Sequence, residues 1–246
     1  MTHDTARTLA APAILALGLS LGGFAAGQGF VQSRRADRFV TVKGVSEREV
    51  EADLALWPLS VSVADDDLAV AQGEIDTAVE HVVAFLGSVG IDGTAVTAMG
   101  VQVTDRATER FGEFRAGQKR YVVTHSVMVR TADLDAIDAA SAGIGRLLET
   151  GVSLSTPDGW GYSRPTYVFT RLNDLKPSMI AEATASAREA AERFAEDSRS
   201  RLGGIRRANQ GIFEILPRDA APGIEESTQR HKRVRVVSTV EYFLEG

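Results

Sequence analysis

The alternation of hydrophobic and polar residues along the chain predicts a mixture of strands and helices. Apolar residues recur at every second position in segments that are expected to be strands, and at every third or fourth position in segments that are expected to be helices. The predicted strands are 39–42 and 54–63, joined by a turn near Gly44, followed by 94–104, 120–130, 152–155, 165–171, 210–216 and 233–244. The predicted helices are 68–89, 133–150 and 173–204.

The helix predicted over 173–204 has both of its ends encoded locally. Asn173 or Asp174 is suited to cap its first turn, and Gly203 with Gly204 is suited to end it. Its apolar face is mostly alanine, so its backbone is expected to lie close to the sheet that it covers. The residues on this face are Ile180, Ala183, Ala187, Ala191, Phe194, Ser198 and Leu202, of which Phe194 is the one large anchor.

The order of these elements favours an α+β fold. Residues 86–105 and 202–219 share one pattern, in which a helix end is followed by a glycine turn, a strand, a loop and a long second strand. We therefore expect two related strand-helix-strand-strand halves, with a largely antiparallel sheet covered by helices.

The N-terminal region predicts a membrane helix in addition to this domain. Leu9–Val31 contains 23 residues without a formal charge, and a helix of that length spans roughly 34 Å, enough to cross a hydrocarbon core. The segment is either a retained anchor, which we favour, or a signal peptide cleaved near Ala25-Ala26-Gly27. We accordingly divide the chain into a membrane segment, residues 1–33, and a folded domain, residues 34–246.

Composition narrows the chemistry. The chain has no cysteine, which excludes disulfides, thiolate zinc sites and thiol nucleophiles. The formal net charge of −6 disfavours a nucleic-acid partner. Arg34, Arg35 and Arg38 follow the apolar segment whereas only Arg7 precedes it, and by the positive-inside rule this bias would place the domain in the cytoplasm.

No catalytic motif for phosphate binding, acyl transfer or metal-dependent hydrolysis is found in the sequence. Asp65, Asp66 and Asp67 are interpreted as a helix start and not as a calcium loop, because no glycine or distal glutamate follows at the required spacing. His125, on an apolar strand, is interpreted as a core or interface histidine. We predict no metal site and no cofactor.

Two loops carry candidate binding residues. In the turn 156–163, Asp158, Trp160 and Tyr162 provide a carboxylate, a stacking face and a phenol for a small ligand, or alternatively the two aromatic residues brace a hairpin. In the hairpin tip 107–119, Phe111 and Phe114 contact another subunit or else fold back onto their own sheet.

A late basic cluster is interpreted as a solvated loop, because Glu225 and Glu226 lie close to it in sequence. Its residues are Arg230, His231, Lys232, Arg233 and Arg235.

The alanine-rich helix and its flanks resemble the SIMPL-domain family, in which a strand leads into a helix of the form AxxxAxxxAxxxA that is closed by a glycine turn. The matching positions are Ala183, Ala187, Arg188, Ala191, Ala195, Gly203 and Gly204. Residues 39–63 are similar to the first two strands of the family, with Gly44 and Asp53 at matching positions. The sequence departs from the pattern at Ser46, where a second glycine is usual, and at Ala52, where a proline usually precedes the aspartate.

This resemblance implies an α+β domain of the bacterial envelope, related to the periplasmic immunogenic proteins. Some relatives assemble into large rings, and some are linked to oxidative-stress tolerance. The family has no established enzymatic activity. The resemblance implies export of the domain, although the small excess of arginine after the apolar segment favours the cytoplasm. We therefore expect the domain to lie in the periplasm, attached to the inner membrane or free if the signal is cleaved.

The function expected from the sequence is a non-enzymatic, self-associating envelope protein without a nucleic-acid partner. The first alternative is a small-ligand-binding module that uses the Trp160/Tyr162 turn. The second is a hydrolase or isomerase with Asp158 or His125 as its general base.

Overall fold

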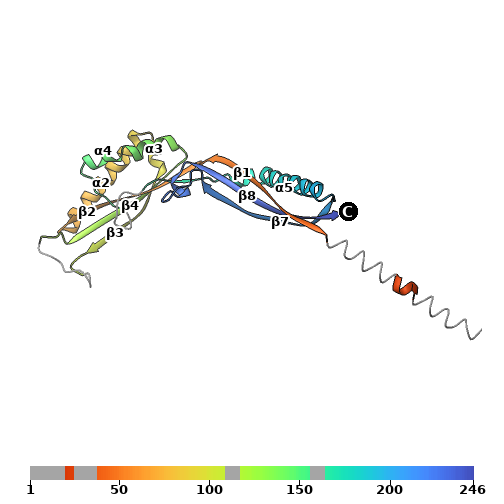
Figure 1. Ribbon diagram of the computed structural model, residues 1–246. Coiled ribbons are helices and arrows are strands. Elements are labelled where there is room, and N and C mark those ends of the chain that lie inside the picture. Colours follow the sequence, from red (N-terminus) through yellow and green to blue (C-terminus); the bar gives the residue numbers. More distant parts are fainter. Residues whose placement is uncertain (1–19, 25–37, 109–116, 156–163) are drawn as a thin grey trace, which may run out of the picture. The chain divides into compact units, whose positions relative to one another are not determined.

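A computed structural model describes residues 20–24, 38–108, 117–155 and 164–246 (Figure 1). The chain divides into two compact units, which are described separately. Unit 1 contains residues 1–47, 176–214 and 235–246, and unit 2 contains residues 48–175 and 215–234. The fold is α+β with antiparallel strand pairs, as the sequence predicts.

Unit 2 contains a five-stranded sheet covered on one face by three helices (Figure 1). Its strands are β2 (Leu54–Asp65), β3 (Val96–Asp105), β4 (Tyr121–Thr131), β5 (Leu154–Ser155) and β6 (Thr166–Val168). Its helices are α2 (Leu68–Ser88), α3 (Leu134–Ala142) and α4 (Ile144–Glu149). Two short 3-10 turns, η1 (Gly93–Ala95) and η2 (Glu226–Thr228), complete the unit.

β2 is a central strand, although its Pro58 favours an edge position or a bulge. β4 pairs antiparallel with the whole of β2 on one side, and Pro58 lies opposite Met128. On the other side β6 pairs with residues 54–56 and β5 with Ser60 and Val61. The proline therefore lies in the gap between the two short strands, where a missing N–H leaves no ladder bond broken.

The ends of α2 agree with the sequence. Asp67 caps the helix, because its carboxylate accepts a hydrogen bond of 2.7 Å from the backbone N–H of Ala69. After the helix, Gly90 adopts a positive φ of 92° and reverses the chain.

The helix predicted over 133–150 is two helices in the structure. The side chain of Asp133 caps α3 by accepting from Ala136 N at 2.9 Å. Gly143 ends α3 and begins α4 with a ψ of 3°. Glycine is a poor helix former, so the chain breaks at this position.

The core of unit 2 lies between the helices and one face of β2 and β4. Trp57 is 1% exposed on this face. The same core cluster contains buried side chains of α2, α3 and α4: Ile75, Val82, Leu86, Ile137 and Leu147. This face of the sheet is thus closed over β2 and β4.

Unit 1 is built from most of a three-stranded sheet and one helix. The strands β1 (Phe39–Glu51), β7 (Arg201–Pro217) and β8 (His231–Glu245) occur in the order β1-β8-β7. The helix α5 (Leu172–Asp197) lies along this sheet (Figure 1). Residues 48–51, 215–217 and 231–234 of the strands belong to unit 2.

The turn predicted near Gly44 is wrong, because β1 continues through this residue to Glu51. A Cβ atom added to Gly44 would lie 1.9 Å from the carbonyl oxygen of Ala183 and 2.4 Å from the backbone nitrogen of Ala187. Gly44 is therefore needed for the close approach of α5 to β1. The sequence predicts a turn here because a turn and a close approach of two backbones both favour glycine.

The alanine face of α5 is confirmed, with Ala183, Ala187 and Ala191 each 0% exposed. Phe194 is not its anchor, since this side chain is 49% exposed. The large apolar groups of this small core come from the strands instead: Val40, Val240 and Tyr242.

The predicted stop of α5 at Gly203 and Gly204 is also wrong. The helix ends at Asp197, and Arg199 adopts the left-handed conformation with φ 54°. The N–H of Ser200 donates to the carbonyl of Ala195 at 2.9 Å, which closes the helix end. Both glycines belong to β7, where Gly203 lets the backbone pass close to Phe243.

The two predicted strand-helix-strand-strand sets are present with one topology. The set β2-α2-β3-β4 has the sheet order β2-β4-β3, and the set β1-α5-β7-β8 has the sheet order β1-β8-β7. In chain order, the first set lies entirely between β1 and α5. Of the pattern shared by 86–105 and 202–219, the structure confirms the equivalent strands β3 and β7, but residues 202–217 are strand throughout, without the predicted helix end and glycine turn.

In the N-terminal region the structure describes only residues 20–24, which are helical and expose Leu21 and Phe24. Within the described parts of the chain, no helix combines the length and apolar character needed to cross a bilayer.

Candidate functional site

The edge of the larger sheet is the feature that points most clearly to a function. β3 is an edge strand in the order β3-β4-β2-β5. Side chains that lie opposite each other on antiparallel strands share a face of the sheet. Two rows therefore run from the core to the edge: Val61–His125–Val101 and Val63–Val123–Val103.

Burial falls sharply along these rows. Val123 on β4 is 0% exposed, whereas Val101 and Val103 on β3 are 49% and 48% exposed. The reason is that α2 packs mainly on β2 and β4 and leaves β3 uncovered. The hydrophobic face thus continues beyond its helical cover into solvent; we call Met99, Val101 and Val103 the β3 shelf.

A β-bulge shapes the shelf. The pairing of β3 with β4 shifts between Ala98 and Gly100, so that Met99 is an extra residue without a partner in the register. Gly100 has a φ of 151°, and Met99 is 59% exposed. Bulges at sheet edges redirect side chains, and here the extra residue is an exposed, flexible methionine on the strand that carries Val101 and Val103.

Charged contacts hold the far end of the shelf. The guanidinium of Arg120 donates two hydrogen bonds, of 3.1 and 2.9 Å, to the carboxylate of Asp105. This hydrogen bonding by Arg120 lowers the pKa of Asp105. Lys119 binds Asp65 and Asp66, each at 3.0 Å, and the hydrogen bond to Asp65 raises the pKa of Lys119. These pairs join the ends of β2, β3 and β4 next to the hairpin tip.

The predicted binding residues themselves lie outside the described residues. This applies to Phe111 and Phe114 in the hairpin tip, and to Asp158, Trp160 and Tyr162 in the turn 156–163. Their subunit-contact and ligand-binding roles stay predictions.

His125 lies in one of the apolar rows, half-buried on β4. Among the described residues its Nδ1 atom has no hydrogen-bond partner. A general base is normally oriented through a hydrogen bond to its second ring nitrogen, and the described part of the chain shows no such group at Nδ1. The location of His125 agrees with the interface interpretation, since Val101 of the shelf is its direct neighbour across the strands.

An open groove of about 470 Å³ runs beside β2. Its polar lining comes from α2, from β2 and from the segment before β5: Ser62, Glu74, Thr77, His81 and Ser153. Over the described ranges, no cluster of three or more histidine, aspartate or glutamate side chains is arranged to hold a metal ion.

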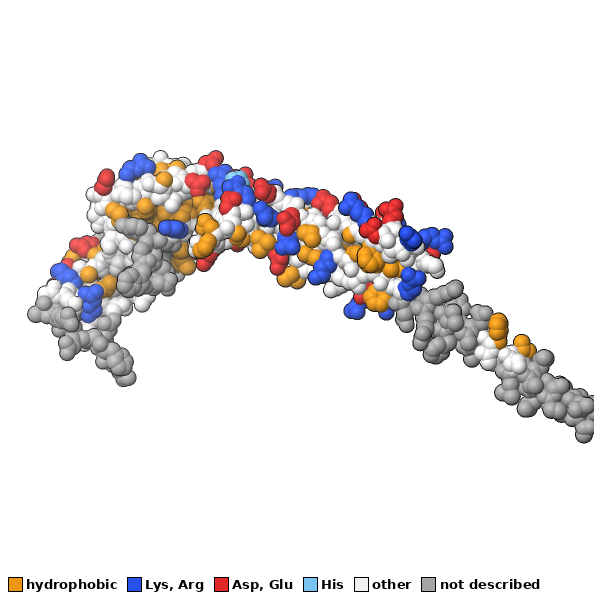
Figure 2. Space-filling view, viewed as in Figure 1, with side chains coloured by type: hydrophobic (Ala, Val, Ile, Leu, Met, Phe, Trp, Pro, Cys, Tyr) orange, Lys and Arg blue, Asp and Glu red, His pale blue; other side chains and the backbone are white. Residues whose placement is uncertain are grey.

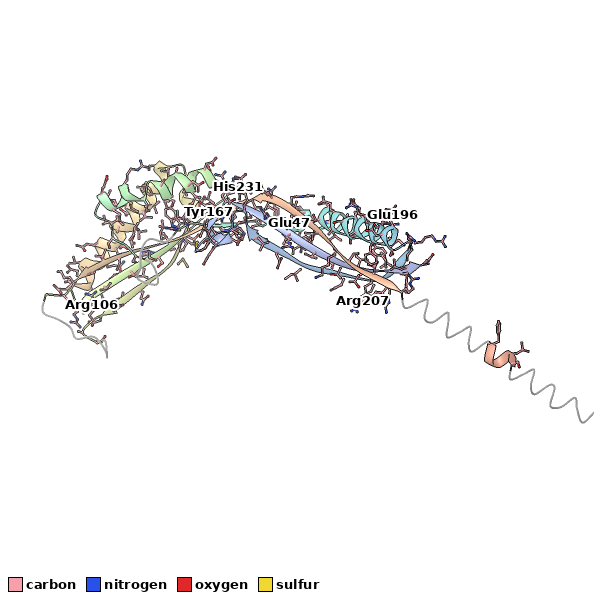
Figure 3. All side chains as sticks on the ribbon, in the orientation of Figure 1. Glu47, Arg106, Tyr167, Glu196, Arg207 and His231 are labelled. Carbon is pink, nitrogen blue, oxygen red and sulfur yellow. The ribbon has the colours of Figure 1, made fainter. Side chains whose placement is uncertain are left out.

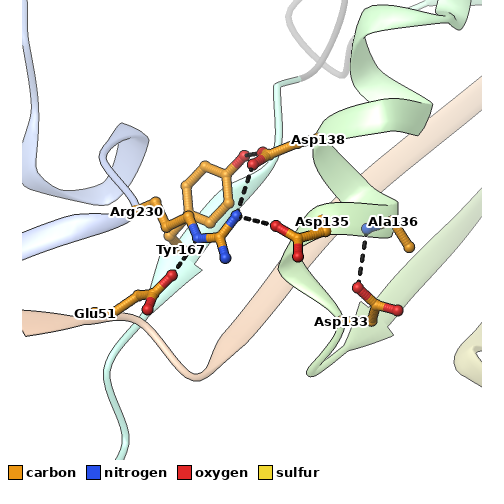
Figure 4. A network of polar contacts seen from close by, with 7 residues as sticks. All are labelled: Glu51, Asp133, Asp135, Ala136, Asp138, Tyr167 and Arg230. Carbon is orange, nitrogen blue, oxygen red and sulfur yellow. Dashed lines mark hydrogen bonds and ion pairs between the residues drawn. The ribbon is translucent and has the colours of Figure 1, made fainter.

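The late basic cluster is not a solvated loop. Arg230 forms ion pairs with Glu51 at 2.5 Å, Asp135 at 2.5 Å and Asp138 at 3.2 Å (Figure 4). Asp138 also accepts a hydrogen bond from the hydroxyl of Tyr167. The hydrogen bond to Asp135 raises the pKa of Arg230, and burial raises the pKa of Tyr167, with the Asp138 carboxylate adding to this effect.

Lys232 is the most buried member of this cluster. It is 0% exposed, and its ammonium donates to the carboxylate of Glu226 and, at 2.7 Å, to the backbone carbonyl of the same residue. This ion pair, in which the lysine side chain is buried, attaches the segment 218–230 to β8. Together with the Arg230 contacts, this pair has a structural role in unit 2.

Residues 40–242 match the family described as SIMPL, a protein of unknown function (DUF541). The chain belongs to the SIMPL family. The resemblance inferred from the alanine face of α5 is thereby confirmed, and the matched range includes all of unit 2 together with residues 40–47, 176–214 and 235–242 of unit 1. No curated protein matches the chain.

Asp53, one of the positions similar to the family pattern, has a clear role in the SIMPL domain. Its carboxylate accepts hydrogen bonds from the backbone N–H and the hydroxyl of Thr170, both at 2.8 Å, and pairs with Arg171 at 3.2 Å. Burial raises the pKa of Asp53, but these contacts outweigh it and hold the pKa below its ordinary value. Asp53 thus fixes the turn between β1 and β2 to the chain that leads into α5.

We expect the free energy of unfolding of Asp53→Asn to fall less in acid than that of the wild type. Because the pKa of Asp53 is lowered by folding, its contribution is fully present above the unfolded pKa and is lost as pH falls through the folded value, below about pH 4. Urea unfolding at neutral pH and at about pH 3 measures the change, with the exposed Asp76→Asn on α2 as the control. A variant that loses stability in acid as steeply as the wild type would contradict this role.

Proposed function

We propose that this SIMPL protein is a non-enzymatic, self-associating module of the bacterial envelope. In this proposal, the uncharged segment Leu9–Val31 holds it in the inner membrane and the domain lies in the periplasm. The observation that supports it best is the β3 shelf, an exposed apolar continuation of the core on an edge strand. Relatives linked to oxidative-stress tolerance suggest the stressed envelope as its setting.

The composition of β3 supports self-association. Edge strands of monomeric proteins are usually protected by charged residues or proline. The segment Val96–Thr104 contains neither, although it exposes Met99, Val101 and Val103. An antiparallel β3 from a second copy would satisfy the free backbone groups and cover the shelf with its own equivalent, as in an isologous interface.

The N-terminal segment supports membrane attachment. Its 23 uncharged residues are long enough for a spanning helix, and the described residues Leu21 and Phe24 expose their side chains at 63% and 67%. Insertion of exposed apolar side chains of this size into lipid is favourable, because it removes their surface from water.

We expect Val101→Lys to weaken self-association at least about tenfold, because each copy would place a charge in the apolar interface. Sedimentation of the full chain in detergent micelles, over a range of protein concentrations, measures the dissociation constant. Ile212→Lys is the matched control, since Ile212 is an exposed apolar residue on a different edge strand, β7, at 79% exposure.

Three outcomes separate the parts of this proposal. A wild-type chain that stays monomeric at high concentration would contradict self-association itself. Dissociation by Ile212→Lys and not by Val101→Lys would move the interface to β7. Loss of association in Val101→Lys alone would support the β3 shelf.

A further inference from the structure

One end of unit 1 combines arginine side chains with exposed apolar groups. The arginines come from the start of β1, the end of α5 and the start of β7: Arg38, Arg199, Arg201, Arg206 and Arg207, all of them exposed. Ile205 and Phe39, which lie among them in sequence, are 55% and 41% exposed. In Figure 2 Lys and Arg side chains lie at this end of unit 1, together with hydrophobic and acidic side chains.

Direct contacts show that these chain segments meet. The guanidinium of Arg38 donates to the hydroxyl of Ser200 at 3.3 Å, and the carbonyl of Arg38 accepts from the N–H of Leu244 at 2.9 Å. The guanidinium of Arg206 stacks 4.0 Å from the ring centroid of Phe39. The starts of β1 and β7 therefore form one surface with the ends of α5 and β8; we call it the basic end.

Part of the charge on the basic end is neutralised. Arg206 pairs with Glu241 of β8 at 3.4 Å. Among the described residues, however, no carboxylate forms an ion pair with Arg199, Arg201 or Arg207. Figure 3 shows Arg207 on β7 well apart from Glu196 on α5. These three guanidinium groups are available for an external anion.

The position of the basic end in the chain indicates which anion it meets. Only the seven residues 32–38 separate the apolar segment Leu9–Val31 from Phe39. Seven residues span at most about 25 Å when fully extended. If Leu9–Val31 lies in a bilayer, as the proposed function states, the first residue of β1 cannot leave the neighbourhood of the lipid headgroups.

We propose that the basic end of unit 1 docks on anionic phospholipid headgroups, with Arg199, Arg201 and Arg207 binding phosphates and Ile205 and Phe39 entering the interfacial layer. Guanidinium groups suit phosphate because their donors match its oxygens in pairs. Aromatic and aliphatic side chains beside them add apolar contact at the headgroup level. This inference rests on the proposed membrane attachment and adds to it a surface, a partner and a fixed approach of unit 1 to the membrane.

The absence of cysteine from the chain allows a direct test. Ile205→Cys in the full chain takes a single environment-sensitive fluorophore, and the protein is placed in nanodiscs of phosphatidylcholine alone or with an equal part of phosphatidylglycerol, each containing headgroup-quencher lipid. We expect strong quenching in the anionic nanodiscs at low salt, and its loss as salt is raised. The control label is Glu214→Cys on the same strand, nine residues further along β7 and about 30 Å away.

The charge requirement is tested in the labelled chain. Arg201→Gln with Arg207→Gln is expected to reduce the quenching at least about twofold in anionic nanodiscs, because each basic residue adds to the attraction of the surface. Lys43→Gln with Arg188→Gln removes the same charge elsewhere in unit 1 and should leave the quenching unchanged.

Failure of the inference is distinguishable from failure of the proposed function. A chain that does not remain in nanodiscs of either composition would contradict the membrane anchor. A chain that remains in the nanodiscs but is quenched equally in both compositions, or equally after Arg201→Gln with Arg207→Gln, would overturn the docking of the basic end on anionic lipid.

Discussion

Replacing Gly44 with alanine is expected to lower the stability of unit 1 by about 3 kcal/mol or more. The added Cβ would overlap the carbonyl oxygen of Ala183, at 1.9 Å, and the backbone nitrogen of Ala187, at 2.4 Å. Both obstacles belong to the backbone of α5, so no rotamer change relieves them. The helix would have to move away from β1 and uncover the small alanine core that it closes. Urea unfolding followed by far-ultraviolet circular dichroism measures the loss.

The matched control for Gly44 is Gly73 in α2, because a Cβ at that position would meet no atom within 4 Å. Gly73→Ala is expected to leave stability unchanged or to raise it by about 0.5–1 kcal/mol, through the better helix propensity of alanine. If Gly44→Ala were as stable as the wild type, α5 would not pack on β1 at this distance.

Removing the carboxylate of Glu226 is expected to destabilise unit 2 by about 3 kcal/mol, because it leaves the buried ammonium of Lys232 without a counter-charge. Lys232 is 0% exposed and keeps only the backbone carbonyl of Glu226 as an acceptor from that residue. The near-ultraviolet signal and fluorescence of Trp57, which lies in the core of unit 2 at 1% exposure, follow the unfolding of Glu226→Ala.

Lys232→Met serves as the control for this ion pair. Methionine fills a similar volume without a charge, so this variant should lose less than Glu226→Ala, and the double variant should lose less than the sum of the two single changes. Additive losses in the double variant would show that the two side chains do not interact.

Local signals in the sequence were sufficient for much of unit 2. Asp67 and Asp133 each precede a run of helical periodicity, and both cap a helix in the structure. The strand pair 94–104 and 120–130 was predicted within two residues of β3 and β4. These features depend on neighbours that are close in sequence, and they are therefore visible without a fold.

The errors concern residues whose role depends on distant contacts. Gly44 was predicted to be in a turn because its partner, Ala183, lies far away in the chain. The end of α5 was predicted at Gly203, but the left-handed position after the helix is occupied by Arg199. Residues other than glycine rarely adopt this conformation, so the sequence does not indicate a helix end at Arg199.

The burial of Lys232 could have been predicted from the sequence. Val234, Val236, Val240 and Tyr242 alternate on one face of the predicted strand, and all of them are buried. Lys232 is two residues before Val234 and has the same register, so extending the strand by one residue would have placed it inward. The high charge of the surrounding segment favoured the loop interpretation instead.

The β3 shelf was only half predictable. The alternation of Val101 and Val103 indicates a strand with an apolar face. The sequence does not state that β3 ends the sheet or that α2 stops short of it, because both depend on how non-adjacent segments pair. Phe111 and Phe114, which the sequence predicts to contact another subunit or their own sheet, lie outside the described residues.

The nested order of the two strand-helix-strand-strand sets has a consequence for how the protein is made. β1 is the first strand to be synthesised, yet its neighbour in the sheet, β8, begins at His231. The elements β2 to β6 form a contiguous stretch and can associate while the chain is still being produced. β1 therefore has no sheet partner until β8 has been synthesised, and an unpaired strand is prone to pair with a wrong edge.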